Sequence, residues 1–438
     1  MIFKTSFGTF KGIEEKYCYA FLGIPFASAR RFEYGTLIDS YKGETDATKF
    51  GPACIQKRVW FEHLEVPERM FYHREFRDNI RFDYSEDCLN LNIYTPKKNG
   101  RHPVIVFIHG GGFDSGANSE SAFDGDALAF RDIVTVFIQY RVGPFGYFTH
   151  EDIQKQYGHN GNFGLSDQIL ALEWVKKHIG EFGGDSSNIT VMGQSAGAIS
   201  IQDLIFSSKA QGLFQKAIMM SGGGKFPSLG APRPAAKTNE YWLAVMEKAG
   251  CKTLEEFKEI PPKKIFEALE EVRKERKDSL VCTMPCYDHY YLEKPYKEMF
   301  KEKVKLPTII GFTNNDMLTI VLARMAIKYA NKNNCYLYYF DVDAKGDDNK
   351  AFHSSDLRYA FGTLDRSWRP YDAKDRTIST LMMDYFASFA RTSDPNSPGL
   401  PHWERKKNMA LSFNPDKVKM VRPPKSVLLR NTFKGDPK

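Results

Sequence analysis

The stretch Ile189-Thr190-Val191-Met192-Gly193-Gln194-Ser195-Ala196-Gly197-Ala198 decides how the chain is interpreted. An apolar, β-branched run leads into the pattern Gly-x-Ser-x-Gly, and residues with helical spacing follow. This order of strand, tight turn and helix predicts a nucleophile elbow with Ser195 at its tip. Gly193 and Gly197 would leave room for the strained backbone of the turn. Ser195 is therefore the candidate nucleophile, provided that partners for it exist elsewhere.

Apolar runs and segments with helical spacing alternate on both sides of the elbow. They predict an α/β fold with a mostly parallel central sheet and helices on both faces, and we expect one domain over residues 1–438. A hairpin is expected at 7–12, and 50–84 is expected to be a long, irregular surface excursion. The candidate helices are 166–179 and 377–391. The candidate strands are 90–94, where the sheet is expected to begin, 104–108, 133–138, 189–194, 216–220, 306–311 and 335–340, the last strand expected.

Composition excludes several classes of protein. The 438 residues are 42% hydrophobic and 26% charged, as in ordinary globular proteins. No window approaches eighteen uninterrupted apolar residues, so we expect no membrane span. Without an apolar N-terminal stretch we expect a cytoplasmic protein, the alternative being a secreted one whose leader has been removed. The net charge of +7 comes from the basic segment 405–438, which we interpret as solvated, the alternative being a tether to an anionic surface. No pattern indicates nucleic-acid binding.

The cysteines predict neither a disulfide framework nor a metal site. Seven cysteines are an odd number in a large chain. Cys282 and Cys286 lack a second Cys/His pair at metal-ligand spacing, so we interpret them as small buried residues. We expect no metal and no cofactor.

A glycine-rich turn follows the strand candidate 104–108. The sequence there is His109-Gly110-Gly111-Gly112-Phe113. Glycines at a strand end allow backbone N–H groups to point into a site without obstruction. The N–H groups of Gly111 and Gly112, with that of Ala196 after the nucleophile, are expected to form an oxyanion hole. The alternative is a flexible turn, but one strand–helix unit separates it from the elbow, and the joint occurrence is far more specific.

A serine nucleophile needs a base, and in α/β-hydrolases the order along the chain is Ser, acid, His. Only His289, His353 and His402 follow Ser195. His289 comes too early for this order, and His402 lies in a Pro-rich segment after the last helix. His353 lies in the loop after the strand 335–340, where the base is expected; the alternative is a solvated loop histidine.

The acid is expected just after the strand 306–311. Asp316 is the carboxylate in that loop, whereas the competitor Asp288 precedes the strand and is interpreted as structural. Asp356, three residues after His353, is expected to steady the histidine loop.

With these residues in place, the chain resembles the type-B carboxylesterases, the family of cholinesterases, mammalian carboxylesterases and bacterial para-nitrobenzyl esterases; it is nearest in style to the last. The resemblance implies an α/β-hydrolase fold, a Ser195–His353–Asp316 triad and Gly111, Gly112 and Ala196 as oxyanion donors. The matching stretches, besides the elbow 193–197, are 21–27, 46–54, 85–92 (Ser-Glu-Asp-Cys-Leu-Asn-Leu-Asn), 140–146, 161–168 and 182–185.

The chain departs from the family pattern at three points, which affect the expected site residues, substrates and cap. Gln194 and Asp316 stand where the family usually has glutamates. Residues 61–85 contain no tryptophan, so choline esters are not expected as preferred substrates. Asp316 and His353 are only 37 residues apart, so we expect a reduced helical cap and an open active site.

The resemblance also implies two structural pairings. The family's first disulfide would join Cys54 and Cys88. Cys251 lacks the partner of the second disulfide and no leader is visible; both features fit a reducing compartment, so we expect Cys54 and Cys88 to be free thiols. The family pattern further implies an ion pair between Arg31 and Glu86.

We therefore expect a serine carboxylesterase acting on small-molecule esters, as a monomer or weak homo-oligomer, without membrane or nucleic-acid partners. A catalytically inactive binding or adhesion member of the fold, and an amidase or peptidase with the same triad, remain alternatives. The stretches 55–85, 222–300 and 317–334 are expected to shape the substrate pockets. Their aromatic residues suit an apolar or aromatic acyl ester, such as a hydroxycinnamate, or else form local core: Trp60, Phe61, Phe71, Tyr72, Phe76, Phe82 and Tyr84.

Overall fold

The computed structural model describes residues 1–61, 67–223, 232–276, 282–316 and 319–424. Its N-terminal part forms a small sheet in which β1 (Ile2–Thr5) and β2 (Gly8–Lys11) pair as an antiparallel hairpin. The strand β7 (Glu44–Asp46) lies parallel to β2 and completes it. A hairpin was predicted at 7–12, whereas the structure places it at 2–11, so the predicted stretch supplies its second strand. Short pairs of strands follow in this region: β5 (Ala27–Ser28) with β6 (Thr36–Leu37), and β8 (Ala53–Cys54) with β9 (Tyr84–Ser85).

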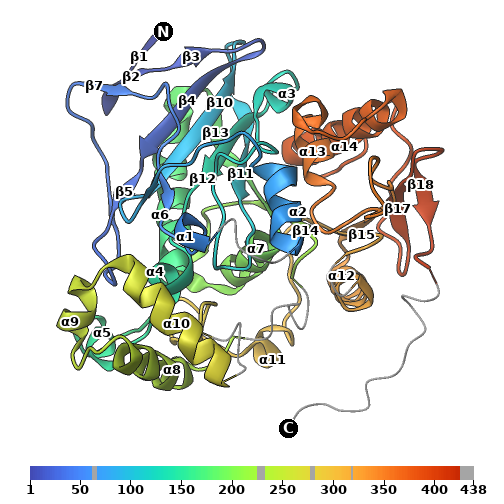
Figure 1. Cartoon of the computed structure of the whole chain (residues 1–438). Helices are drawn as coiled ribbons and strands as arrows, with labels where there is room; N and C mark the ends of the chain where they lie inside the picture. The colour runs from blue at the N-terminus through green and yellow to red at the C-terminus, as the bar shows by residue number, and fades with distance from the viewer. Residues whose placement is uncertain (62–66, 224–231, 277–281, 317–318, 425–438) are drawn as a thin grey trace.

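A central sheet, eleven-stranded within the described residues, crosses the molecule (Figure 1). Neighbouring strands from β12 to β17 run parallel, and the antiparallel strands lie at the two edges. The expected mostly parallel α/β sheet is confirmed. In order across the sheet the strands are β18 (Lys419–Val421), β17 (Ala410–Phe413), β16 (Tyr336–Phe340), β15 (Thr308–Thr313), β14 (Lys216–Met220), β13 (Gly184–Gln194), β11 (His102–Ile108), β12 (Val134–Ile138), β10 (Asn90–Pro96), β4 (Cys18–Pro25) and β3 (Ile13–Glu14).

Helices cover both faces of this sheet, so its inner strands are buried on both sides. Along β11, Val104 and Val106 face one core, and Ile105 and Phe107 face the other. This is why the run predicts a strand by continuous hydrophobicity rather than by alternation. The helices and 3-10 turns are α1 (Arg58–Phe61), α2 (Pro67–Phe76), α3 (Asp126–Ala129), α4 (Gly143–Tyr147), α5 (Glu151–Tyr157), α6 (Phe163–His178), η1 (Ile179–Phe182), α7 (Ala196–Phe206), η2 (Ser208–Ala210), α8 (Ala235–Lys248), α9 (Leu254–Glu259), α10 (Pro262–Arg276), α11 (Tyr296–Met299), α12 (Thr319–Asn333), α13 (Leu357–Phe361), η3 (Leu364–Arg366) and α14 (Ala373–Thr392).

Three expectations about the elements were wrong. The sheet does not begin at 90–94, because β3 and β4 precede that strand and β4 pairs with β10. The strand 335–340 is not the last, since β17 and β18 follow α14 and extend the sheet. The segment 50–84 is not an irregular surface excursion, because it contains α2, whose Glu75 and Phe76 are buried. In all three cases tertiary packing decides the structure of short segments whose local pattern is weak.

The helices of the described chain were also compared with the length that a bilayer requires. None of them is both long enough and apolar enough to cross a membrane.

Candidate active site

Ser195 occupies a sharp turn between β13 and α7. Its backbone has φ 56° and ψ −122°, a conformation that non-glycine residues rarely adopt. A Cβ on Gly193 would lie 2.7 Å from the carbonyl carbon of Gly197, and one on Gly197 would collide with the carbonyl oxygen of Ile108. Both glycines are therefore required by close backbone approach, and the predicted elbow geometry is present. Ser195 is partly exposed, while its neighbours on both sides are buried.

The glycine turn after β11 lies directly beside the elbow. A Cβ on Gly110 would be 3.1 Å from the Cβ of Ser195. Gly111 and Gly112 have φ values of 112° and 64°, and a side chain on Gly111 would collide with the carbonyl oxygen of Ser115. Within the part of the chain that the structure describes, the N–H groups of Gly111, Gly112 and Ala196 donate to no other protein group. They are available to a ligand oxygen, as an oxyanion hole requires.

A buried histidine, His109, packs against this turn and stabilises it. The sequence did not predict this structural role. His109 Nδ1 lies 2.9 Å from the carbonyl oxygen of Gly110, and its Nε2 lies 3.1 Å from Gln139 Nε2. The ring stacks on Tyr140 at 4.4 Å, and the Tyr140 hydroxyl donates to the carbonyl oxygen of His109 at 2.9 Å. Burial lowers the pKa of His109 to about 4, so this imidazole is neutral and structural at pH 7. The one sequence feature that indicates such a role for His109 is its position directly before the three glycines.

Asp316 and His353 meet at the carboxyl edge of the same sheet. His353 Nδ1 is hydrogen-bonded to Asp316 Oδ1, and both residues are buried. The loops that carry them are themselves joined, because Asn315 and Phe352 form a β-bridge and the Asn315 N–H donates to the carbonyl oxygen of Ala351 at 2.9 Å. The structure thus brings together the acid and the base that strand order predicts.

The surroundings of His353 favour its protonated form. Burial opposes the charged imidazolium, but the Asp316 carboxylate and its hydrogen bond outweigh burial, and the pKa of His353 is raised above its ordinary value. Asp356 adds a smaller contribution of the same sign. Burial raises the pKa of Asp356 itself to about 6, while the Tyr338 hydroxyl donates to its Oδ2 at 2.7 Å. The expectation that Asp356 steadies the histidine loop is consistent with this anchoring to β16.

The second ring nitrogen of His353, Nε2, faces the elbow and contacts Gln194 there. Gln194 Nε2 lies 3.1 Å from His353 Nε2. In the neutral imidazole we assign the proton to Nδ1, which faces the carboxylate, so that Nε2 accepts the N–H of the Gln194 amide. Among the described residues no hydrogen bond joins Ser195 to His353. Serine–histidine contacts in unliganded sites often tighten only when substrate binds.

Asp288, the other candidate for the triad acid, is hydrogen-bonded within its own turn. Asp288 Oδ1 accepts the backbone N–H groups of Tyr290, Tyr291 and Leu292, at 3.1, 2.9 and 2.9 Å. It closes a turn, as its interpretation as a structural residue predicts.

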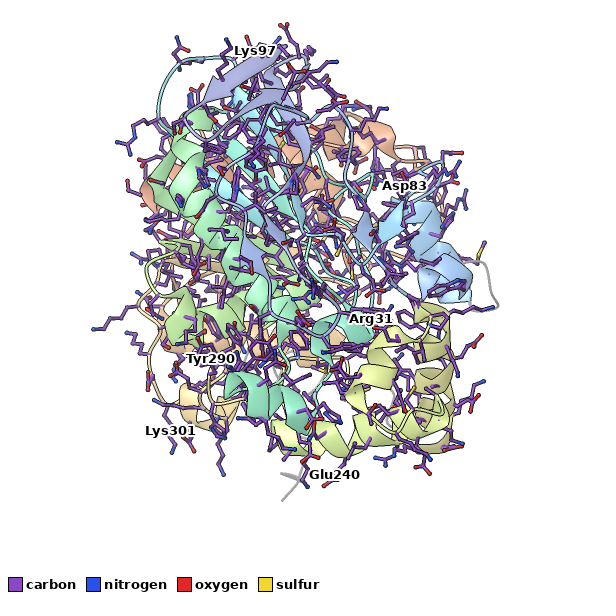
Figure 2. The ribbon with its side chains drawn as sticks, turned by 90° about the vertical axis from the view of Figure 1, so that its left-hand side faces the viewer. Arg31, Asp83, Lys97, Glu240, Tyr290 and Lys301 are labelled. Carbon is purple, nitrogen blue, oxygen red and sulfur yellow. The ribbon has the colours of Figure 1, made fainter. Side chains whose placement is uncertain are left out.

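The predicted ion pair between Arg31 and Glu86 is confirmed. Arg31 Nε donates to Glu86 Oε2 at 2.8 Å, and Nη1 donates to the carbonyl oxygens of Lys258 and Ile260 at 2.6 Å each. Arg31 therefore links the N-terminal segment to the end of α9, and Figure 2 shows it where these two parts of the molecule meet.

The cysteines are buried thiols throughout the described chain. A hydrogen bond with Cys54, together with burial, raises the pKa of the Cys88 thiol well above its ordinary value. The oxidation state of this pair in the cell remains a prediction.

The aromatic residues of 55–85 contribute mainly to packing. Phe76 belongs to a buried core cluster, Phe71 and Tyr72 pack against it, and Trp60 packs on Phe266 with ring centroids 5.6 Å apart. The local-core interpretation holds for these residues. Parts of the stretches expected to shape the pockets, namely 62–66, 224–231, 277–281 and 317–318, lie outside the described residues.

Comparison with known proteins identifies the family. Residues 1–328 and 322–426 match the profile of the "Carboxylesterase family". The para-nitrobenzyl esterase of Bacillus subtilis (strain 168) is 28% identical over 90% of this chain and 91% of its own length. A medium-chain fatty acyl-CoA hydrolase precursor of Anas platyrhynchos is 34% identical over 73% of this chain and 58% of its own length. A solved structure of a thermophilic PNB esterase superposes with a TM-score of 0.81 at 25% identity, covering 97% of this chain and 98% of the other. The chain belongs to the carboxylesterase family and is a carboxylic ester hydrolase of the α/β-hydrolase fold.

Proposed function

We propose that this esterase uses Ser195 as nucleophile, His353 as general base and acid, and Asp316 as the residue that orients the imidazole. The observation that carries the proposal is the buried Asp316–His353 pair, whose imidazole contacts Gln194, the residue directly before the strained and partly exposed Ser195. Ser195 attacks the ester carbonyl while His353 Nε2 takes its proton. His353 then returns the proton to the leaving alcohol.

The tetrahedral oxyanion would be held by the N–H groups of Gly111, Gly112 and Ala196. Gly111 and Gly112 are fixed in left-handed conformations, so these donors are oriented before substrate arrives and need little reorganisation. Ala196 begins α7, whose N-terminal end carries a partial positive charge that favours the same oxygen. Water activated by His353 would then hydrolyse the acyl-enzyme.

We further propose small to medium apolar or aromatic acyl esters as substrates and the cytoplasm as the place of action. The short connection between Asp316 and His353, which contains only α12 and β16 among described elements, supports a site with a reduced cap. The buried thiols suit a reducing compartment.

The proposal is tested with para-nitrophenyl esters and a fluorophosphonate probe. The wild-type protein should hydrolyse the esters and gain one probe adduct on Ser195 by peptide mass mapping. Ser195→Ala should lose the adduct and about 10⁴-fold or more of kcat. Turnover retained by Ser195→Ala would remove the mechanism. Absence of both turnover and labelling in the folded wild type would favour an inactive binding member of the fold, and cleavage of matched anilides would favour an amidase or peptidase.

A further inference from the structure

The helix α2 packs directly on the loop that carries His353. In Figure 1 it lies beside the orange segment that leads into α13. The Tyr72 hydroxyl donates to the backbone carbonyl oxygen of His353 at 3.4 Å. The preceding residue, Phe71, meets Phe352 edge to face, with centroids 4.9 Å apart and planes at 87°. The residue before the proposed base and the base itself are thus both contacted from α2.

A buried arginine connects α2 to the same loop a second time. Arg369 Nε donates to Glu75 Oε1 and Oε2 at 3.0 and 3.1 Å. On its other side, Nη1 and Nη2 donate to the two carboxylate oxygens of Asp347 at 2.9 and 2.8 Å, and Nη1 also donates to the carbonyl oxygen of Lys345 at 2.7 Å. The guanidinium carbon lies 5.1 Å from the centre of the Phe352 ring. Arg369 therefore holds residues 345–352 against α2.

Both charges at the centre of this connection are withdrawn from water. Glu75 and Arg369 are 1% and 3% exposed, so neither charge can exchange its partner for water. The Trp368 indole N–H donates to Glu75 Oε1 at 2.9 Å and fixes the carboxylate further. Removing one member would leave the other charges buried and incompletely paired, and the loop would have to rearrange.

We propose that α2 positions His353 for catalysis, through Tyr72 directly and through Glu75 by way of Arg369. Neither residue is assigned contact with substrate, so both are positioning residues. The inference rests on the proposed role of His353 as the base. Because proton transfer needs the base within hydrogen-bond reach of the nucleophile, a small shift of the loop lowers kcat while leaving substrate binding unchanged.

The test compares Tyr72→Phe and Glu75→Gln with matched controls away from the site. Tyr72→Phe removes one hydroxyl and keeps the ring. Its control is Tyr385→Phe, which removes a hydroxyl that donates to the carbonyl oxygen of Pro401 at 2.5 Å. Glu75→Gln keeps the shape of the side chain and removes its charge. Its control is Asp384→Asn, which breaks an ion pair with Arg131 at 2.6 Å.

Steady-state kinetics should separate positioning from stability. Tyr72→Phe should lower kcat about two- to tenfold with KM unchanged, and Glu75→Gln should lower it about tenfold or more. Fluorophosphonate labelling of Ser195 should slow in parallel. The controls should keep wild-type kcat and KM even where their melting temperatures fall. Should Glu75→Gln fail to fold, Tyr72→Phe decides the question alone.

Two results would overturn the inference. One is an unchanged kcat in Tyr72→Phe, or a change in KM alone. The other is an equal loss of kcat in a control variant with an equal loss of melting temperature, which would mean that stability is the cause. Failure of the proposed function gives a different result, because Ser195→Ala would then keep its labelling and turnover, and the positioning role would fall with it.

Discussion

Two opposing electrostatic effects act on the buried imidazole of His353, and their balance determines the pH dependence of activity. Burial disfavours the imidazolium, whereas the Asp316 carboxylate stabilises it and prevails, so the pKa is raised. The base must be neutral to accept the Ser195 proton. Activity is therefore full above the folded-state pKa and is lost as pH falls through it. The acid limb of kcat/KM should have its midpoint above the ordinary histidine value of about 6.5.

The variant Asp316→Asn tests this balance by removing the carboxylate that raises the pKa of His353. Without the carboxylate the pKa of His353 should fall, so the acid limb of the residual activity should move to lower pH. At the same time kcat should drop by about 10⁴-fold, because the amide no longer selects the productive tautomer. The check is a pH profile of kcat/KM. Asp288→Asn serves as the control, and a comparable loss of kcat in that variant would contradict the assignment of the acid.

The variant Gln194→Glu tests the same balance by adding a second carboxylate beside the imidazole of His353. The amide lies 3.1 Å from His353 Nε2, so a carboxylate there would stabilise the imidazolium from its second nitrogen. The pKa of His353 should rise further, and the acid limb should move to higher pH than in the wild type. Measured on the same ester, a limb that stays in place or moves to lower pH would show that residue 194 does not face the base in solution.

At the scale of single elements, the turn after β11 requires glycine at position 111. Gly111→Ala would force a side chain into a left-handed conformation and against the carbonyl oxygen of Ser115. We expect a loss of about 10²–10³-fold in kcat, the cost of displacing an oxyanion donor. Gly158→Ala, at a positive φ of 75° but in open space at the end of α5, is the matched control for backbone strain alone. Equal activity of the two variants would exclude the turn from the site.

The strand β8 ends at Cys54, beside Cys88, and both thiols lie in the core. The raised pKa of Cys88 lowers the thiolate fraction available for disulfide formation. We expect protein purified under anaerobic conditions from a cytoplasmic source to have the same intact mass before and after reduction. A mass that rises by two hydrogens per molecule on reduction would indicate the disulfide instead.

The elements that could be predicted from sequence are those with a strong local signal. The strand before Ser195, the helix after it and the glycine turn follow from continuous apolar runs and from glycines at fixed offsets. Strand order was then enough to select Asp316 and His353. The helix α2 could not be predicted in this way. Its sequence mixes charged and apolar residues without a clear apolar face, and its buried Glu75 is paired with Arg369, nearly three hundred residues later along the chain.

The same reason explains the missed strands and the missed role of His109. β17 and β18 are short, and only pairing with β16 and with each other defines them as strands. His109 looks like part of a glycine turn until Gln139 and Tyr140 are folded against it. Contacts between distant segments decide these features, and a linear pattern does not record them.

For the molecule as a whole, the proposed reduced cap predicts tolerance of large acyl groups. Among the described elements, only α12 and β16 lie between Asp316 and His353, and this short connection is the basis of the proposed reduced cap. Para-nitrophenyl esters of increasing chain length and feruloyl esters should therefore give comparable kcat/KM values. A steep fall beyond short acyl chains, or a deep closed gorge over Ser195 in a crystal structure, would contradict the open site.

The bridge between Asn315 and Phe352 separates the triad into two structural parts. It couples the acid loop and the base loop to each other, whereas Ser195 belongs to a separate turn fixed by β13 and α7. Asp316 and His353 are therefore held to each other independently of the elbow. We expect this pair to stay intact during the reaction, while Ser195 replaces Gln194 as the hydrogen-bond partner of the imidazole.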